Sequence, residues 1–342
     1  MEIEPFSVSL SSPLETAAGR VERREGFLVY LEYQGTKGVG EATPLPGWTE
    51  TKEECRAALG RAAEIAEELD WGIALTKTDA PAARHGLSLA LAEARARASD
   101  QPLYRYLDDD RLVTSVPVNA TIGDQPPEGT ADAAEQAVRE GFDSLKLKVG
   151  ARPVSTDVER VRAVRERVSN GVELRADANG AWTREEATEA IEAFAAFDVA
   201  YVEQPLPADD LAGHTELRGG PVDIALDESL AAYTIDEILA ELAADVVVVK
   251  PMVVGGPDRA HDVAMTASEV GVDPVISTTV DAVVARTGAV HVAASLPAVR
   301  PCGLATGSLL ATDLSADPAP VSDGAIEVPQ GKGLGLPDRP AK

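Results

Sequence analysis

The chain has 342 residues, of which 44% are hydrophobic and 26% charged, as expected for a globular protein with one large domain or one large and one small domain. Its net charge of -26 is scattered through many segments, so the surface repels nucleic acids and anionic membranes and excludes them as partners. The only cysteines, Cys55 and Cys302, are far apart in sequence, which excludes a disulfide framework and a thiolate metal site.

The N-terminal segment, residues 1–46, predicts a β-meander. Hydrophobic residues alternate from Ile3 to Leu10, and a β-rich run over 26–33 is followed by a turn at 34–36. A Pro-Leu-Pro-Gly-Trp loop at 44–48 ends the meander.

Two helices follow the meander. The first is predicted over residues 50–70, with Thr49 or Thr51 as its N-cap, and the second, rich in Ala and Arg, over about 80–99. Meander and helices together predict an N-terminal α+β domain over residues 1–105.

From residue 112 onward, predicted strands alternate with predicted helices. The strands span 116–122, 144–149, 172–177, 199–203, 223–227, 245–250, 273–277 and about 299–304. The clearest helical patterns span 131–140, 157–168, 184–195, 234–243 and 257–270. Such alternation implies parallel pairing, so the fold class is α/β, with a (β/α)8-type TIM barrel over 112–307. Residues 308–342 are predicted to return and pack on the N-terminal domain.

A doubly wound open sheet is the alternative architecture. That fold would need a glycine-rich nucleotide turn after its first strand. The stretch Thr121-Ile-Gly-Asp124 follows the first predicted strand and lacks the dinucleotide-binding spacing. The barrel is therefore the favoured interpretation.

The stretch Ser144–Gly150 places two lysines on one face of a strand. Lys146 and Lys148 alternate with apolar residues, and side chains two apart on a strand point the same way. Half-buried strands often present lysine to solvent, which is the simpler interpretation. The composition favours a site, because the chain has only eight Lys against 23 Arg, and a third lysine, Lys250, closes another predicted strand.

Five charged residues end five consecutive predicted strands. They are Lys148, Asp177, Glu203, Asp227 and Lys250, at intervals that fall from 29 to 23 residues, about one β/α unit each. All strand C-termini of a barrel meet on one face. Each acid alone is more simply explained as a turn or helix cap, but three carboxylates in one space need a counter-charge. All-oxygen ligands suit Mg²⁺, with Mn²⁺ as the alternative.

The residues at these strand ends lie in short motifs that resemble the signature of the enolase superfamily, in its muconate-cycloisomerase-like branch. The resemblance covers nearly the whole chain and implies an N-terminal α+β capping domain, a barrel and a C-terminal return. It also implies metal-dependent removal of a proton next to a carboxylate, with a lysine base. The matching motifs are Lys146-Leu-Lys148, Asp177-Ala-Asn-Gly180, Val202-Glu-Gln-Pro205, Leu226-Asp-Glu-Ser229 and Val249-Lys-Pro251.

The resemblance implies a role for each residue of the strand-end group. The metal ligands would be Asp177, Glu203 and Asp227. Lys148 would be the base, Lys146 would favour its neutral form and bind the substrate carboxylate, and Lys250 would lie on the opposite face of the substrate.

Two supporting inferences follow from positions along the chain. Asn179 is expected on the same strand face as Asp177, where it would orient the site. A histidine base is excluded, because none of the four histidines lies at a predicted strand end. They are His85, His214, His261 and His291.

Within the branch, the chain most resembles the o-succinylbenzoate synthases of menaquinone biosynthesis. Gly40–Trp48 is similar to the capping-domain loop of that family. Dipeptide epimerases carry an Asp-x-Asp pair at the eighth strand, whereas Cys302–Gly307 contains no acid. The resemblance thus implies a hydro-lyase acting on a small-molecule carboxylate. N-succinylamino-acid racemase, dipeptide epimerase and muconate-type cycloisomerase stay open, as does a barrel that binds metal and ligand without catalysis.

The remaining expectations concern the substrate pocket, the location and the habitat. No apolar run approaches the ~20 residues of a membrane span, and Met1–Glu4 lacks a signal-peptide pattern, which predicts a cytoplasmic protein. Acid enrichment with few lysines resembles proteins of salt-accumulating halophiles. The sequence leaves the oligomeric state open.

The expected pocket and supporting residues are Trp48, Asn179, Glu228, Ser277, Thr278, Thr279, Gly303 and Thr306.

Overall fold

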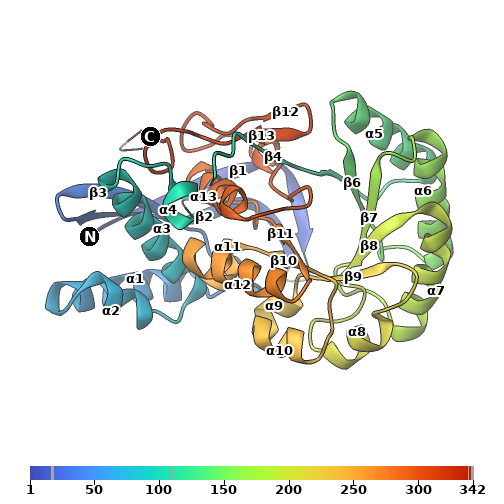
Figure 1. The fold of residues 1–342 in the computed structure, drawn as a ribbon, viewed down its shortest axis with the longest axis horizontal. Coiled ribbons are helices and arrows are strands. Elements are labelled where there is room, and N and C mark those ends of the chain that lie inside the picture. Colours follow the sequence, from blue (N-terminus) through green and yellow to red (C-terminus); the bar gives the residue numbers. More distant parts are fainter. Residues whose placement is uncertain (17–18, 109–110, 338, 340–342) are drawn as a thin grey trace.

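The structure is a computed structural model that describes residues 1–16, 19–108, 111–337 and 339. An N-terminal α+β unit lies beside a larger unit in which parallel strands are surrounded by helices (Figure 1). The fold class predicted from the sequence, a TIM-type barrel with an N-terminal α+β domain, is confirmed.

The predicted meander is a three-stranded antiparallel sheet. Its strands are β1 (Glu2–Thr16), β2 (Gly19–Tyr33) and β3 (Thr36–Ala42), in that order across the sheet. Gln34 and Gly35 connect β2 to β3 with φ values of 50° and 81°. Two consecutive left-handed residues form the tight turn whose twist matches that of a hairpin.

Helices follow this sheet along the chain. They are α1 (Lys52–Glu68), α2 (Trp71–Thr76), α3 (Pro81–Ala98) and α4 (Leu103–Leu107). Thr51, one of the two predicted N-caps, forms a capping box with Glu54 at the start of α1. A Cβ atom on Gly40 would lie 2.0 Å from the Gly86 carbonyl oxygen, so the glycine lets α3 pack directly on the sheet.

The barrel contains seven parallel strands in one curled sheet. Their order is β11-β10-β9-β8-β7-β6-β5. The bounds are β5 (Ala120–Ile122), β6 (Ser144–Lys148), β7 (Glu173–Asp177), β8 (Val199–Glu203), β9 (Asp223–Leu226), β10 (Val246–Val249) and β11 (Asp273–Ile276).

The eighth strand is reduced to two bridging residues. Cys302 pairs with Val118 and Gly303 pairs with Ser277, so this short segment closes the barrel between its first and last strands. The prediction of a full strand over 299–304 was wrong. Pro301 has no N–H to donate, which limits the ladder on this side.

The first predicted strand, 116–122, was also only partly correct, because the structure divides it into two strands. β4 (Ser115–Pro117) pairs antiparallel with β13 (Ala325–Glu327), whereas β5 pairs with β6. Val118 and Asn119, between the two strands, face the closing segment 302–303 instead.

The barrel helices include all five predicted ones and four more. Helix α13 was missed because its sequence is buried all round, with no amphipathic stripe to identify it. The predicted helices are α5 (Pro127–Arg139), α6 (Val154–Arg167), α7 (Arg184–Phe194), α10 (Ile235–Ala240) and α12 (Pro257–Glu269). The others are α8 (Leu211–Leu217), α9 (Ser229–Ala232), α11 (Pro251–Val254) and α13 (Val283–Ser295), with short 3₁₀ turns at η1 (Ala195–Phe197) and η2 (Gly307–Leu309).

The C-terminal tail contacts both units. β12 (Val321–Ser322) and β13 form a small sheet with β4 at the start of the barrel. Leu310 bridges to Leu10 of β1, and Leu334 is buried among hydrophobic residues of α3 and α13. The tail is the red segment beside the N-terminal unit in Figure 1.

The interior of the barrel is filled below the strand C-termini. Tyr201, Ala225 and three valines form an apolar cluster inside the sheet. The guanidinium of Arg175 lies 4.9 Å from the centre of the Tyr201 ring and donates to the Pro301 carbonyl oxygen at 2.6 Å. This packing leaves the C-terminal ends of the strands as the face available for a site. None of the described helices is long and apolar enough to cross a bilayer.

A buried histidine predicts acid sensitivity of the fold. His291 on α13 is fully buried, stacks on Tyr104 at 6.0 Å between ring centres, and accepts the Tyr104 N–H at 3.3 Å. Burial lowers the pKa of His291 to about 4. Because the unfolded chain takes up this proton near pH ~6.5, stability is complete above that pH and is lost as the pH falls toward 4.

We expect this proton uptake to lower the free energy of unfolding by on the order of 3 kcal/mol between about pH 7 and pH 4. Urea unfolding of the parent and of His291→Asn across this range, at constant salt, measures the slope. The variant should show a shallower slope whatever its absolute stability. An unchanged slope would assign the acid sensitivity to other groups.

Candidate functional site

The strand register brings the first three predicted site residues into one row. Lys148 on β6 pairs with Asp177 on β7, which pairs with Glu203 on β8. Neighbouring strands lie about 4.8 Å apart, so these side chains leave the sheet next to one another. Asp227 and Lys250 come directly after β9 and β10, at the same end of the barrel.

The ammonium groups of Lys146 and Lys148 both contact the carboxylates. The Lys146 ammonium lies 2.9 Å from Glu203 Oε1 and 3.1 Å from Asp177 Oδ2. The Lys148 ammonium donates to Asp177 Oδ2 at 2.6 Å and to Asn179 Oδ1 at 2.8 Å. The Lys148 side chain is 35% exposed against 12% for Lys146, so Lys148 is the more accessible amine for a ligand.

Lys250 approaches the site from the other side. Its ammonium donates to Asp227 Oδ2 at 2.6 Å and lies 3.7 Å from the centre of the Trp48 ring. A cation over an indole face is an attractive contact. Trp48 belongs to the loop after β3, so the N-terminal unit itself forms part of the site.

Asn179 joins the site, although not from a strand. β7 ends at Asp177, and Asn179 lies in the following loop with φ of 45°, so the expectation that both share a strand face was wrong. The loop still brings the amide to the site, where Nδ2 donates to Glu228 Oε1 at 3.0 Å. Asn179 thus links the Lys148 ammonium to a fourth carboxylate.

Burial and neighbouring charges shift the pKa values of the site carboxylates. Burial, followed by the neighbouring charge of Asp177, raises the pKa of Glu203 to about 7. Burial also raises the pKa of Asp227 to about 6, against the opposing effect of Lys250. For Asp177, burial favours a higher pKa, but the ammonium groups of Lys148 and Lys146 outweigh it and lower the pKa.

The Lys146 ammonium is stabilised by this environment. Burial favours its neutral form, but the carboxylates of Glu203 and Asp177 outweigh burial and hold the pKa of Lys146 well above its usual value. Lys146 therefore stays cationic, as expected of a group that binds a substrate carboxylate or neutralises the site.

The donor set fits a hard divalent cation. Asp177, Glu203 and Asp227 are between 1% and 3% exposed and offer only oxygen donors, the chemistry preferred by Mg²⁺. Asp227 Oδ1 is buried without a hydrogen-bond partner among the described residues, and so is Glu228 Oε2. Within the described ranges no three acidic, histidine or cysteine side chains already form a cage, because lysine ammonium groups lie between the carboxylates.

The predicted residues on the seventh and eighth strand ends contact one another. Ser277 donates to the Gly303 carbonyl oxygen at 3.2 Å, and the hydroxyls of Thr278 and Thr306 are 3.0 Å apart. Thr279 donates to Asp281. Among the residues that the structure describes, these hydrogen bonds do not reach the lysines or carboxylates of the site.

Gln204 is a supporting residue that the sequence reasoning did not identify. It is fully buried, with φ of 42°, and directly follows Glu203. Its Oε1 accepts the N–H groups of Asp227 and Ser229 at 3.0 and 3.2 Å. Gln204 therefore ties the ends of β8 and β9 together. Its place in the Glu-Gln-Pro motif was the available signal.

A buried ion pair supports the end of β6 and was also missed. Arg160 on α6 donates to the Lys148 carbonyl oxygen and to Asp157 Oδ1, both at 2.7 Å. Asp157 in turn accepts the Gly150 N–H at 2.8 Å. These contacts hold the backbone on both sides of Lys148, and only the fold brings α6 to this strand.

All four histidines lie on helices. His85 is on α3, His214 on α8, His261 on α12 and His291 on α13. His85 contacts the Glu41 carbonyl oxygen, and His214 contacts the Asp210 carbonyl oxygen. None of the described histidine contacts reaches the site lysines.

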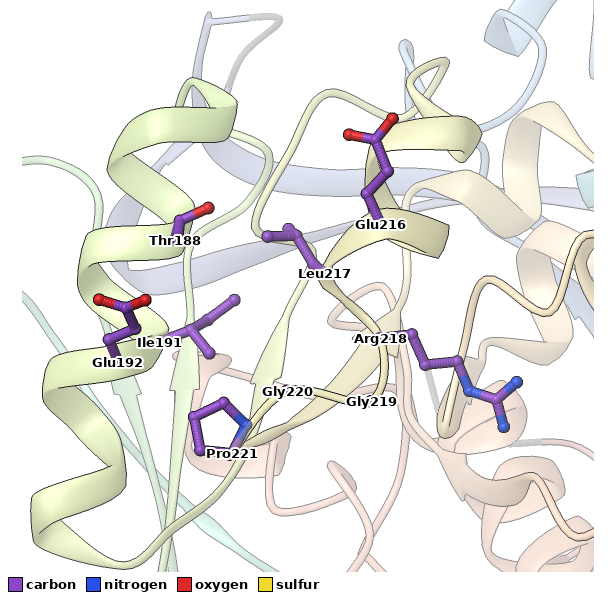
Figure 2. A pocket seen from close by; sticks show the side chains of 9 residues that line it. All are labelled: Thr188, Ile191, Glu192, Glu216, Leu217, Arg218, Gly219, Gly220 and Pro221. Carbon is purple, nitrogen blue, oxygen red and sulfur yellow. The ribbon is translucent and has the colours of Figure 1, made fainter.

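A surface hollow lies away from this site. It has a volume of about 290 Å³ and lies between α7 and the loop before β9, at the opposite end of the strands (Figure 2). The Arg218 side chain points away from the other lining residues (Figure 2). Its guanidinium donates to Asp245 Oδ1 at 2.7 Å. The lining residues of the hollow are Thr188, Ile191, Glu192, Glu216, Leu217, Arg218, Gly219, Gly220 and Pro221.

Comparisons with known proteins match both units. Residues 129–340 match the Enolase C-terminal domain-like family, and residues 2–94 match the MenC N-terminal domain. The chain is 30% identical to the L-Ala-D/L-Glu epimerase of Bacillus subtilis, over 98% of this chain and 95% of that protein. It is 37% identical to the o-succinylbenzoate synthase of Thermobifida fusca, over 63% of this chain and 67% of that protein.

Solved structures agree with the sequence matches. A substrate-liganded complex of the B. subtilis epimerase superposes with a TM-score of 0.88 and 28% identity, covering 97% of this chain and 96% of that one. A dipeptide epimerase of Enterococcus faecalis, complexed with Mg and L-Leu-L-Tyr, has a TM-score of 0.85 and 27% identity, with 98% of each chain covered. From these matches, the chain belongs to the enolase superfamily.

Proposed function

We propose that this protein is a metal-dependent o-succinylbenzoate synthase, a hydro-lyase of menaquinone biosynthesis. Its substrate would be 2-succinyl-6-hydroxy-2,4-cyclohexadiene-1-carboxylate, which loses water to become an aromatic ring. The observation that carries this choice is the end of the eighth strand, where Cys302–Gly307 contains no acid. Asp281 in the adjoining loop is 2% exposed and bonded to Thr279, so it is not offered to a ligand.

An eighth-strand end without an acid disfavours a substrate whose ammonium group would lie there, because that charge would be desolvated without a partner. A succinyl or aromatic substrate has no such requirement. The match of residues 2–94 to the MenC N-terminal domain supports the same choice, since this domain supplies Trp48 to the site.

The charged residues have distinct tasks in this proposal. Asp177, Glu203 and Asp227 would hold Mg²⁺, with Mn²⁺ as the alternative. Bound there, the cation would offset negative charge that builds on the substrate carboxylate. The ammonium groups of Lys146 and Lys250 would add to this stabilisation from two sides.

Lys148 performs both proton transfers. As a neutral amine it removes the proton from the ring carbon that carries the carboxylate, and the electron pair forms the new ring double bond as hydroxide leaves. The resulting ammonium then gives its proton to the hydroxide on the same face, which releases water and restores the amine. Asp177 and Asn179, which contact Nζ at 2.6 and 2.8 Å, set the direction of this amine.

A dipeptide epimerase is the second candidate, favoured by the 30% identity to the B. subtilis enzyme over nearly the whole chain. It would use Lys148 and Lys250 as two bases, one on each face of the substrate carbon. An N-succinylamino-acid racemase or a muconate-type cycloisomerase would use the same residues. A barrel that binds ligand without catalysis is the remaining alternative.

Turnover of the dehydration substrate separates these candidates. The assay would follow aromatisation by ultraviolet absorbance with Mg²⁺, and EDTA as the control. Molar KCl is included because we propose a halophilic origin for the charge of -26, and salt at that level screens carboxylate repulsion beyond about 3 Å. We expect metal-dependent kcat/KM above ~10⁴ M⁻¹s⁻¹. No turnover by folded protein would reject the synthase in favour of racemisation, epimerisation or cycloisomerisation.

A further inference from the structure

A buried glutamate of the N-terminal unit caps a barrel helix. Glu41, at the end of β3, is 0% exposed. Its two carboxylate oxygens accept the N–H groups of Ala282 and Ala285, each at 2.9 Å, at the start of α13. Thr43 donates a third hydrogen bond to the same carboxylate at 2.5 Å. One side chain thus satisfies three donors from both units.

Arg24 extends this contact into the loop that carries Trp48. Its guanidinium donates to the Thr43 carbonyl oxygen at 2.8 Å and to the Pro44 carbonyl oxygen at 3.4 Å. It also lies 4.0 Å from Asp281 Oδ1 on the barrel side. The guanidinium therefore holds the first two residues of loop 43–48 and faces the loop that precedes α13.

Internal hydrogen bonds hold loop 43–48 in a compact conformation. The N–H groups of Trp48 and Thr49 donate to the Leu45 carbonyl oxygen at 3.0 and 2.9 Å, and the Thr49 hydroxyl accepts the Leu45 N–H at 2.9 Å. A compact loop moves as one piece, so the contacts at its base set the position of Trp48 over Lys250.

The barrel loop on the other side, residues 278–282, is strained. Val280 has φ of 60°, which is unfavourable for a β-branched residue and persists only where the surroundings impose it. Asp281 accepts hydrogen bonds from the hydroxyl and the N–H of Thr279. The Glu41 contact with Ala282 anchors the C-terminal end of this loop.

We propose that Glu41 is a positioning residue for the reaction. Its carboxylate sets loop 43–48, with Trp48, and barrel loop 278–282 at fixed places around the Lys250 side of the site. The group does not touch Lys148 or the three metal-binding carboxylates, so it acts on the binding of the substrate and not on the proton transfer. Only the kinetic part of the test rests on the proposed function.

Glu41→Gln removes one acceptor at nearly constant volume, and Glu41→Ala removes the whole contact. We expect amide hydrogen exchange to accelerate in both loop 43–48 and segment 278–285, because both lose the same partner. KM should rise about tenfold or more, in line with the cost of small misplacements, while kcat and Mg²⁺ affinity change little. Thr43→Val, which deletes a single hydroxyl, should give a smaller effect of the same kind.

Glu93→Ala is the matched control. Glu93 is also a 0% exposed glutamate of the N-terminal unit, and it accepts the Leu334 N–H from the tail at 2.6 Å. Its loss should lower the melting temperature without faster exchange in either loop and without the rise in KM. This comparison separates positioning from general destabilisation of the N-terminal unit.

The outcomes are distinguishable. Exchange that accelerates in only one loop or in neither, in Glu41→Gln or Thr43→Val, would overturn the proposal. An equal rise of KM in Glu93→Ala would do the same, because the effect would then be one of stability. If the parent protein itself does not turn over the dehydration substrate, the proposed function fails, while the exchange measurements still decide whether Glu41 couples the two loops.

Discussion

Replacing Lys148 by alanine is expected to lower kcat for dehydration by roughly 10²–10⁴-fold, the usual contribution of general acid–base catalysis. The reason is that Lys148 is the exposed amine of the site and is aimed by Asp177 and Asn179. Stopped-flow or steady-state absorbance at saturating Mg²⁺ measures the loss. Mg²⁺ affinity and the melting temperature should stay near those of the parent, because the carboxylates remain.

Two companion variants make this test specific. Lys52→Ala removes a surface lysine that pairs with Glu25 at 3.0 Å, and it should leave kcat unchanged. Lys250→Arg keeps a cation opposite the base: a dehydratase should retain most of its activity, whereas an enzyme that needs two lysine bases should lose it. Activity of Lys148→Ala within about tenfold of the parent would exclude this lysine as the base.

Loss of a carboxylate of the proposed metal site is expected to have the second large effect. In Glu203→Gln the acid at the end of β8 is replaced at nearly constant volume, and one of three anionic donors is lost. We expect Mg²⁺ affinity to fall by at least about tenfold to a hundredfold and turnover to be abolished at Mg²⁺ levels that saturate the parent. Isothermal titration in molar KCl measures the affinity independently of activity.

Mg²⁺ should also raise the melting temperature of the parent, since a ligand that binds only the folded chain stabilises it. This shift should disappear in Glu203→Gln. Glu173→Gln is the control, because Glu173 lies at the other end of the neighbouring strand, where it pairs with Arg175 at 2.6 Å. A parent protein whose stability does not respond to Mg²⁺ or Mn²⁺ would contradict the metal site.

The geometry of the barrel explains why so much of the site was predictable. Residues at strand ends meet on one face of any parallel barrel, so the spacing of Lys148, Asp177 and Glu203 along the chain was enough to bring them together. Their roles as base and metal ligands stay predictions that the variants above test. The N-cap at Thr51 could also be predicted from sequence, because its capping box involves two residues only three apart.

Other elements were misjudged because their local signals are weak. Helix α13 is buried on every side, and so has no amphipathic periodicity to identify it. The eighth strand consists of two bridging residues, far below the length at which alternation is visible. Asn179 was expected on a strand, but its backbone is left-handed, and no pattern of side chains reports such a turn reliably.

The sequence by itself thus determined the fold class, the parallel order of the strands and the charged row at their ends, because each depends on periodicity and spacing within single β/α units. Only the tertiary structure decided how the barrel closes and which groups support the site. The bonds from Gln204 to Asp227, from Arg160 to Lys148 and from Glu41 to Ala282 span 23, 12 and 241 residues. They depend on a three-dimensional approach of separate elements, which is set by packing of the whole chain.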